Sequence, residues 1–229
     1  MRMLEKGPLL GLAMAACLAG LGAAAPEGEK KPDAPKAPPR VAEVELTGIV
    51  AVRHSFFDVA KDALKAEQDF KAPKEALADR ILVTAAGVYS FAEFPRNAEL
   101  LKDFGPDTTV TVRGKNLIAG SLLWLDQAEK AQGGAPIDVA KFSKAKGEKT
   151  VLEGTNRCQC QLDVAGLPHS CKLGHLHHFQ APDGTVYHYL PIGVGATNLS
   201  GKGVHGKAVR VKALLLPGNH LLVESTELK

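Results

Sequence analysis

Short segments rich in Val, Leu and Tyr recur along the chain and are bounded by Gly, Pro, Asn and Asp. Apolar and polar residues alternate within several of them, most clearly in Val110–Lys115 and Val209–Lys212. A period of two with turn residues at both ends is typical of half-buried β-strands, so the pattern predicts a mainly β protein. Ala119-Gly120 and Pro217–Asn219 separate paired apolar runs and are predicted to be hairpin turns.

The strand-like segments also form an internal repeat. Segments of the first half recur in the second half 98 to 106 residues later: Val44–Gly48 with Thr150–Gly154, Gly87–Phe91 with Val186–Tyr189, Val110–Lys115 with Val209–Lys212, and Leu122–Asp126 with Leu221–Ser225. The last two pairs share an offset of 99 residues. A conserved offset of this kind predicts two structural units of similar architecture.

The first half closes with the pattern V-x-V-x-G-K, a turn and L-L-x-L-D at Val110–Asp126, and the second half closes with the similar segments Val209–Lys212 and Leu221–Ser225. This rhythm resembles the last two strands of OB-fold barrels. The resemblance implies two small OB-like β-barrels in tandem, a fold that binds ligands through its loops. It implies no particular site residues.

The predicted organisation has five parts. They are a signal peptide at 1–25, a flexible spacer at 26–40, a first OB-like unit at 41–130, a linker at 131–149 and a second OB-like unit at 150–229. In the first unit, Val59, Ala63, Ala66 and Phe70 recur at helical spacing, which predicts a helical insertion over about 58–80, with a break at Pro73. A second short helix is expected over 97–103.

The N-terminus indicates export. Arg2 and Lys6 precede an apolar run at 9–21, and small residues follow at 22–25, as in a cleaved secretory signal. The run is shorter than the roughly 20 residues of a membrane-spanning helix, so no stable span is expected after cleavage. Lipidation at Cys17 is disfavoured because the residues after it stay apolar. The expected location is the bacterial periplasm or the extracellular space.

Charge and aromatic content narrow the choice of partners. The net charge is only +3, aromatic residues make up 5% of the chain, and no long run of one sign occurs. Nucleic-acid binding requires a concentrated basic face and often stacking aromatics, so nucleic acid is not an expected partner. A protein partner in the cell envelope remains compatible with this composition.

Cysteine and histidine are concentrated in one stretch of the second half. Three of the four cysteines and four of the eight histidines lie between residues 158 and 178. If Cys158 and Cys160 lie on a strand, their side chains point to the same face; the same holds for His175 and His177, with His178 turned away. Random placement does not produce this density, so the stretch is the candidate functional site.

These residues predict a transition-metal site. Cys158, Cys160, Cys171 and His175 form a Cys₃His set, with His177 or His169 able to replace one member. Zn²⁺ accepts such a tetrahedron, and thiolates equally suit Cu(I). The predicted cofactor is therefore a Zn or Cu ion, and the surplus histidines would allow ligand exchange. His205, in a Gly-rich loop at 201–207, can also reach the cluster.

Two alternatives remain open. Three cysteines in an exported protein can form one disulfide, from Cys158 or Cys160 to Cys171, in a non-enzymatic module that binds a protein or small ligand. Alternatively, Cys158 and Cys160 can act as a redox pair.

No C-x-x-C-H, G-x-S-x-G or H-E-x-x-H motif occurs, so haem attachment and catalysis are not expected. At the Gly48/Gly154 alignment the first half has Val52 and His54 in place of the two cysteines, so it lacks the site.

Overall fold

The computed structural model describes residues 41–65, 79–133, 136–162, 177–193, 198–200 and 202–229. The chain divides into two units, Met1–Ala37 and Pro38–Lys229, and every described residue belongs to the second. The predicted signal peptide and spacer therefore lie outside the described residues.

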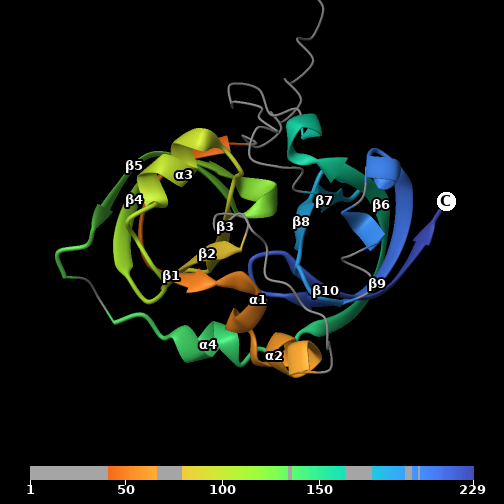
Figure 1. Cartoon of the computed structure of the whole chain (residues 1–229), viewed down its shortest axis with the longest axis horizontal. Helices are drawn as coiled ribbons and strands as arrows, with labels where there is room; N and C mark the ends of the chain where they lie inside the picture. Colours follow the sequence, from red (N-terminus) through yellow and green to blue (C-terminus); the bar gives the residue numbers. More distant parts are fainter. Residues whose placement is uncertain (1–40, 66–78, 134–135, 163–176, 194–197, 201) are drawn as a thin grey trace, which may run out of the picture. The chain divides into compact units, whose positions relative to one another are not determined.

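Two closed five-stranded barrels make up the described chain (Figure 1). The strands of the first barrel are β1 (Val41–Val52), β2 (Arg80–Thr84), β3 (Val88–Phe91), β4 (Thr109–Leu117) and β5 (Leu122–Lys130). They follow the order β1-β2-β3-β5-β4, and β4 closes the barrel by pairing with β1.

The second barrel repeats this topology. Its strands are β6 (Glu148–Cys158), β7 (His177–Gln180), β8 (Val186–Tyr189), β9 (Ala208–Leu216) and β10 (His220–Leu228). They follow the order β6-β7-β8-β10-β9, and β9 pairs back with β6. The sequence prediction of two OB-like barrels in tandem is confirmed.

Short helices occupy the connections between strands. The α-helices are α1 (Arg53–Phe56), α2 (Asp58–Lys65), α3 (Pro95–Leu101) and α4 (Val139–Ser143), and the 3₁₀ turns are η1 (Ile118–Gly120), η2 (Gln159–Gln161) and η3 (Lys202–Val204). α2 lies within the helical insertion expected at about 58–80, and α1 precedes that range. Residues 66–78 of the expected insertion lie outside the described residues, and Arg80 belongs to β2 rather than to a helix. α4 lies inside the predicted linker, and β6 begins at Glu148, two residues before the second unit was expected to begin.

The barrels match strand for strand, with one correction to the predicted repeat. β3 pairs with β5 through Ser90 and Leu122, and β8 pairs with β10 through His188 and His220. The counterpart of Leu122 is therefore His220, at an offset of 98 residues, and not Leu221. The offset falls from 99 to 98 residues because four residues separate β4 from β5, whereas three separate β9 from β10.

Gly48 and Gly154 occupy equivalent positions in the first strand of each barrel. A Cβ atom on Gly48 would lie 2.7 Å from the Val83 carbonyl oxygen, and one on Gly154 would lie 2.4 Å from the Gln180 carbonyl oxygen. Carbon and oxygen do not approach this closely, so only glycine allows the next strand to cross there. The repeat therefore includes a steric requirement of the barrel as well as similar strand composition.

Apolar side chains from both barrels share two buried clusters. One cluster joins Ile81 and Val83 of β2 to Leu190, Leu216 and other residues of the second barrel. The other joins first-barrel residues to two residues of the second half: Ala92, Leu117, Leu122 and Trp124 with Leu162 and Val186. The junction between the barrels is thus a continuous part of the core.

Contacts across the junction are reciprocal. A Cβ on Gly120 would lie 2.9 Å from the Val186 Cβ, and a Cβ on the equivalent Gly218 would lie 2.3 Å from the carbonyl oxygen of Val88, the equivalent of Val186. The Asn219 side chain also donates to the carbonyl oxygen of Ala119 at 3.2 Å. Matching positions of the two barrels therefore face each other, as in a two-fold interface.

Three fully buried histidines line this junction: His178, His188 and His220. The His188 Nε2 donates to the Gly120 carbonyl, and the His188 Nδ1 bonds the His178 Nδ1 at 3.0 Å. The His220 Nδ1 donates to the Pro217 carbonyl at 2.8 Å, and its Nε2 bonds the Ser90 hydroxyl at 3.1 Å. One proton on each ring satisfies all these bonds, which corresponds to neutral histidine.

Burial makes the charged form of these rings unfavourable. It lowers the pKa of His188 to about 4, with the nearby Arg53 guanidinium adding to the effect. Burial, together with His188 and Arg53, also places the pKa of His220 well below its usual range. The junction therefore requires neutral histidines.

Acidification is expected to destabilise the fold. Between pH 6.5 and about 4 the unfolded chain binds more protons than the folded chain at His188 and His220, so the free energy of unfolding falls as the pH falls. Each histidine contributes up to about 1.4 kcal/mol per pH unit. Urea unfolding at neutral pH and near pH 5 measures this loss. His220→Leu, which introduces the residue type of the equivalent Leu122, should reduce the slope. Equal stability at the two pH values would contradict the prediction.

Candidate metal centre

Cys158, Cys160 and His205 form a group that could hold a metal ion. One ligand atom from each residue, the two sulfurs and a ring nitrogen, lies within 4.8 Å of the other two. Cys158 is fully buried, whereas Cys160 and His205 are half-buried. Among the described residues this is the one such group of His, Cys, Asp and Glu side chains.

The turn η2 brings the two cysteines together. Cys158 is the last residue of β6, and Gln159–Gln161 form a single 3₁₀ turn. The Gln161 side chain accepts a hydrogen bond from the Cys158 backbone N–H at 3.4 Å, which caps this turn. The sequence prediction attributed the pairing to alternation along one strand. In the structure, the two cysteines are instead brought together because the strand β6 ends at Cys158 and the turn η2 follows.

Asn156 positions the loop that carries His205. Its buried side chain donates to the carbonyl oxygens of Leu199 and Val204, both at 3.0 Å. Its backbone carbonyl accepts from the N–H of Gly206 at 2.7 Å. The loop is thus anchored on both sides of His205 by a residue that lies two positions before Cys158.

The adjacent histidines of β7 point to different environments. The His177 ring lies beside His205, with ring centroids 5.4 Å apart, and its Nδ1 donates to the Leu199 carbonyl. His177 therefore supports the His205 loop without being a member of the three-residue group. His178 contacts His188 at the barrel junction, as expected for a residue turned away from the cluster.

The predicted and observed ligand sets overlap only in part. The structure brings Cys158 and Cys160 together and places His177 beside them, while Cys171, His175 and His169 lie outside the described residues. The predicted ligand set leaves out His205, which the fold adds to the group. The sequence indicated only that His205, a histidine in a Gly-rich loop, can reach the cluster.

The chemistry of the group suits a soft or borderline metal ion. Two sulfurs and an imidazole nitrogen are donors that Zn²⁺ and copper accept, whereas Ca²⁺ and Mg²⁺ prefer oxygen. Asp183 is an exposed carboxylate in the turn after β7, where it accepts from the Thr185 N–H at 2.9 Å. Its hydrogen bonds to Thr185 lower its pKa, so it is committed to the turn as a carboxylate.

The equivalent place in the first barrel has different chemistry. Val52 ends β1 where Cys158 ends β6, and His54 takes the position of Cys160. The His54 Nδ1 contacts the Asp79 carboxylate, which also accepts from the His54 backbone N–H at 3.0 Å. Within the described residues, the thiolate–imidazole group is thus specific to the second barrel.

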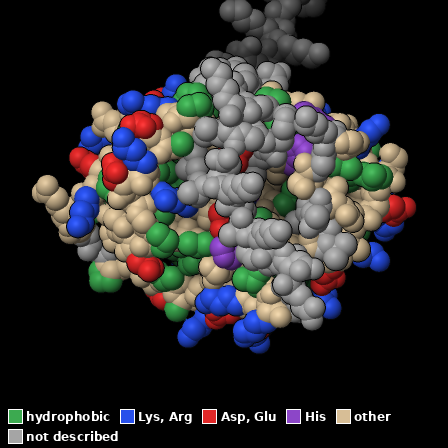
Figure 2. Space-filling view, in the orientation of Figure 1, with side chains coloured by type: hydrophobic (Ala, Val, Ile, Leu, Met, Phe, Trp, Pro, Cys, Tyr) green, Lys and Arg blue, Asp and Glu red, His purple; other side chains and the backbone are tan. Residues whose placement is uncertain are grey.

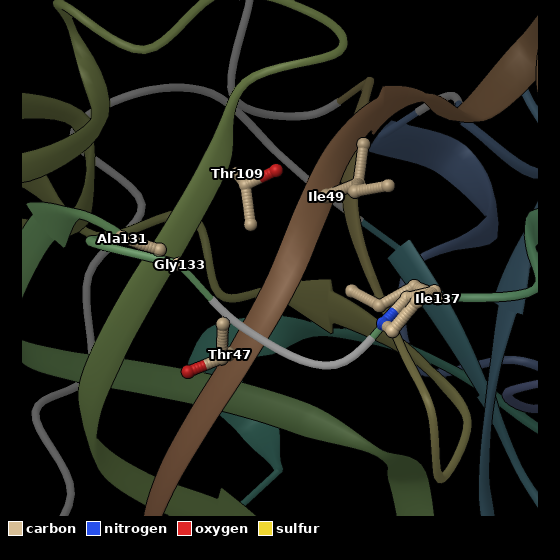
Figure 3. A pocket seen from close by; sticks show the side chains of 7 residues that line it. Thr47, Ile49, Thr109, Ala131, Gly133 and Ile137 are labelled. Atoms are coloured by element: carbon tan, nitrogen blue, oxygen red, sulfur yellow. The ribbon is translucent and has the colours of Figure 1, made fainter.

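A separate pocket of about 370 Å³ lies on the first barrel (Figure 3). Thr47 and Ile49 of β1, Thr109 of β4 and residues of the segment after β5 line it. None of its described lining residues carries a titratable side chain, so it provides no acid, base or metal ligand.

On the face shown in Figure 2, basic and acidic side chains of the described residues are intermixed and form no large basic area.

No protein family, curated protein or solved structure matches this chain. Within the described part of the chain, none of the helices has the length and apolar character needed to cross a membrane. The interpretation of the site therefore rests on its own geometry and chemistry.

Replacing Asn156 should loosen the site by releasing the His205 loop. Asn156→Ala removes two side-chain hydrogen bonds and is expected to lower the free energy of unfolding by about 1–3 kcal/mol. Chemical denaturation measures the change. Asn198→Ala, at an exposed position of the same loop, is the matched control and should leave stability within about 0.5 kcal/mol. Equal effects of the two substitutions would argue against an anchoring role for Asn156.

Proposed function

We propose that this protein is an exported, non-enzymatic binder of a transition-metal ion, zinc or copper, with Cys158, Cys160 and His205 as ligands. The observation that carries the proposal is the convergence of these three donors within 4.8 Å. They come from two separate segments of the second barrel, so their proximity is a product of the fold and not of sequence spacing alone.

The surroundings of the group support binding. Cys158 is fully buried and caps the turn that contains Cys160, so the thiols are held in place before a metal arrives. Preorganisation of this kind reduces the ordering cost of binding. The first barrel has the same fold with Val52 and His54 at the cysteine positions, which indicates that the barrel forms without these ligands and that the group serves another purpose.

A fourth ligand is predicted from sequence. Zn²⁺ in a closed site takes four ligands, and Cys171 and His175 are the candidates in the intervening segment. Cu(I) is also compatible with soft thiolate donors. The N-terminal sequence pattern supports export, and the lack of a catalytic motif supports binding without catalysis.

Metal analysis of the mature protein, combined with thiol titration, tests the proposal. About one equivalent of Zn or Cu per chain is expected, with loss of most of it in Cys158→Ser and His205→Ala, because each substitution removes one of three ligands. His54→Gln is the matched control, since His54 occupies the Cys160 position in the first barrel, and it should retain the metal.

Other outcomes identify the competing functions. Absence of metal with a single titratable thiol would overturn the proposal and favour the disulfide-stabilised binding module. Absence of metal with a low-pKa reactive cysteine would favour the thiol redox protein.

A further inference from the structure

The ligand turn η2 is held by the first barrel through Gln159, the residue between the two cysteines. The Gln159 side chain is 2% exposed. Its Oε1 accepts from the Glu93 N–H at 2.7 Å, and its Nε2 donates to the Glu93 carbonyl oxygen at 3.0 Å. A single side-chain amide therefore forms two hydrogen bonds with the backbone of one residue in the other barrel.

An apolar contact holds the same turn from its other end. Leu162, directly after η2, is 2% exposed and belongs to the buried cluster that contains Ala92, Leu122 and Trp124 of the first barrel. Ala92 precedes Glu93, so the hydrogen bonds and the apolar contact involve the same segment after β3. Cys158 and Cys160 therefore belong to the candidate metal site, while Gln159 between them is bound to the first barrel.

We propose that Gln159 is a positioning residue for the metal, through which the first barrel holds Cys158 and Cys160 in the metal-binding arrangement. This inference rests on the proposed metal-binding function. The physical reason is preorganisation: a turn that is already fixed loses less conformational entropy when metal binds.

Linkage makes the effect reciprocal. If docking of η2 on the first barrel favours metal binding, bound metal must favour docking to the same extent. Metal binding at the second barrel thus strengthens the contacts of η2 with the Glu93 segment and with the cluster around Trp124. The first barrel thereby acquires a role in the affinity of a site to which it contributes no ligand within the described residues.

The chain contains one tryptophan, and Trp124 lies in the cluster that Leu162 joins. Its fluorescence therefore reports on the docked turn without added labels. Metal binding to the unaltered protein is expected to shift Trp124 emission, because the surroundings of a buried indole change when the Leu162 contact tightens.

Gln159→Met is the test variant, since methionine has nearly the same length and preserves packing while removing both hydrogen bonds. Titration of the full-length, metal-free protein with Zn²⁺ against a competing chelator should show affinity weakened about tenfold, as expected for two lost hydrogen bonds. The Trp124 response to Zn²⁺ should also shrink. Co²⁺ provides a spectroscopic signature, because thiolate-to-cobalt absorption reports directly on the two sulfurs.

Ser90→Ala is the matched control. It removes the hydrogen bond between Ser90 and His220, which also crosses the barrel junction but does not involve η2. This variant should lose stability and keep Zn²⁺ affinity and the Co²⁺ spectrum. Equal weakening of metal binding by Ser90→Ala and Gln159→Met would overturn the inference, because it would indicate a general effect of junction stability.

Failure of the inference is distinguishable from failure of the proposed function. If the unaltered protein binds neither Zn²⁺ nor Co²⁺, the proposed function is wrong. If it binds and Gln159→Met binds equally well, only the positioning role is wrong. Leu162→Ala is the second variant in case Gln159→Met does not fold, and it too should weaken Zn²⁺ binding while retaining both cysteines.

Discussion

Apolar burial between the two barrels is the interaction on which the other features depend. A five-stranded barrel encloses a small core, and the chain enlarges it by packing Ile81 and Val83 against Leu190 and Leu216 across the junction. Because this region excludes water, a buried polar group there generally requires a partner. That requirement explains why polar contacts such as the one between His220 and Ser90 appear where the barrels meet.

The same packing determines where chemistry can occur. The barrel interiors and their junction are filled, so reactive side chains collect where the chain leaves a strand. Cys158 is the last residue of β6, and His205 lies in a loop tied to that strand by Asn156. Gln159 then connects this rim of the second barrel to the first. The candidate centre is therefore peripheral to one barrel and close to the contact with the other.

Sequence reasoning recovered the fold because the fold follows from local patterns. Strand alternation and turn residues are short-range signals, and together with the internal repeat they were sufficient to predict two OB-like barrels. The single-residue error in the repeat came from a turn one residue shorter before β10, which matching strand composition cannot detect. The signal peptide and the cell location remain predictions.

The candidate site was harder to predict because its members are brought together by long-range contacts. Buried hydrogen bonds of Asn156 hold the His205 loop beside the cysteines, and no local sequence pattern predicts such bonds. Histidines that look alike in sequence lie in separate environments: His205 belongs to the group with Cys158 and Cys160 that could hold a metal ion, His177 lies beside it, and His188 is buried at the junction. Burial distinguishes these roles, and burial depends on the tertiary fold.

The matching of equivalent positions across the junction has an evolutionary consequence. A homodimer of single-barrel chains would show the same pattern of contacts, in which Gly120 lies next to Val186 and Gly218 lies next to Val88. Gene duplication and fusion of such a subunit would preserve the interface while removing the need for identical halves. Divergence then becomes possible at the strand ends, where one copy carries Val52 and His54 and the other Cys158 and Cys160. Fusion thus converts a symmetric assembly into an asymmetric protein in which one half can specialise while the other retains the ancestral packing.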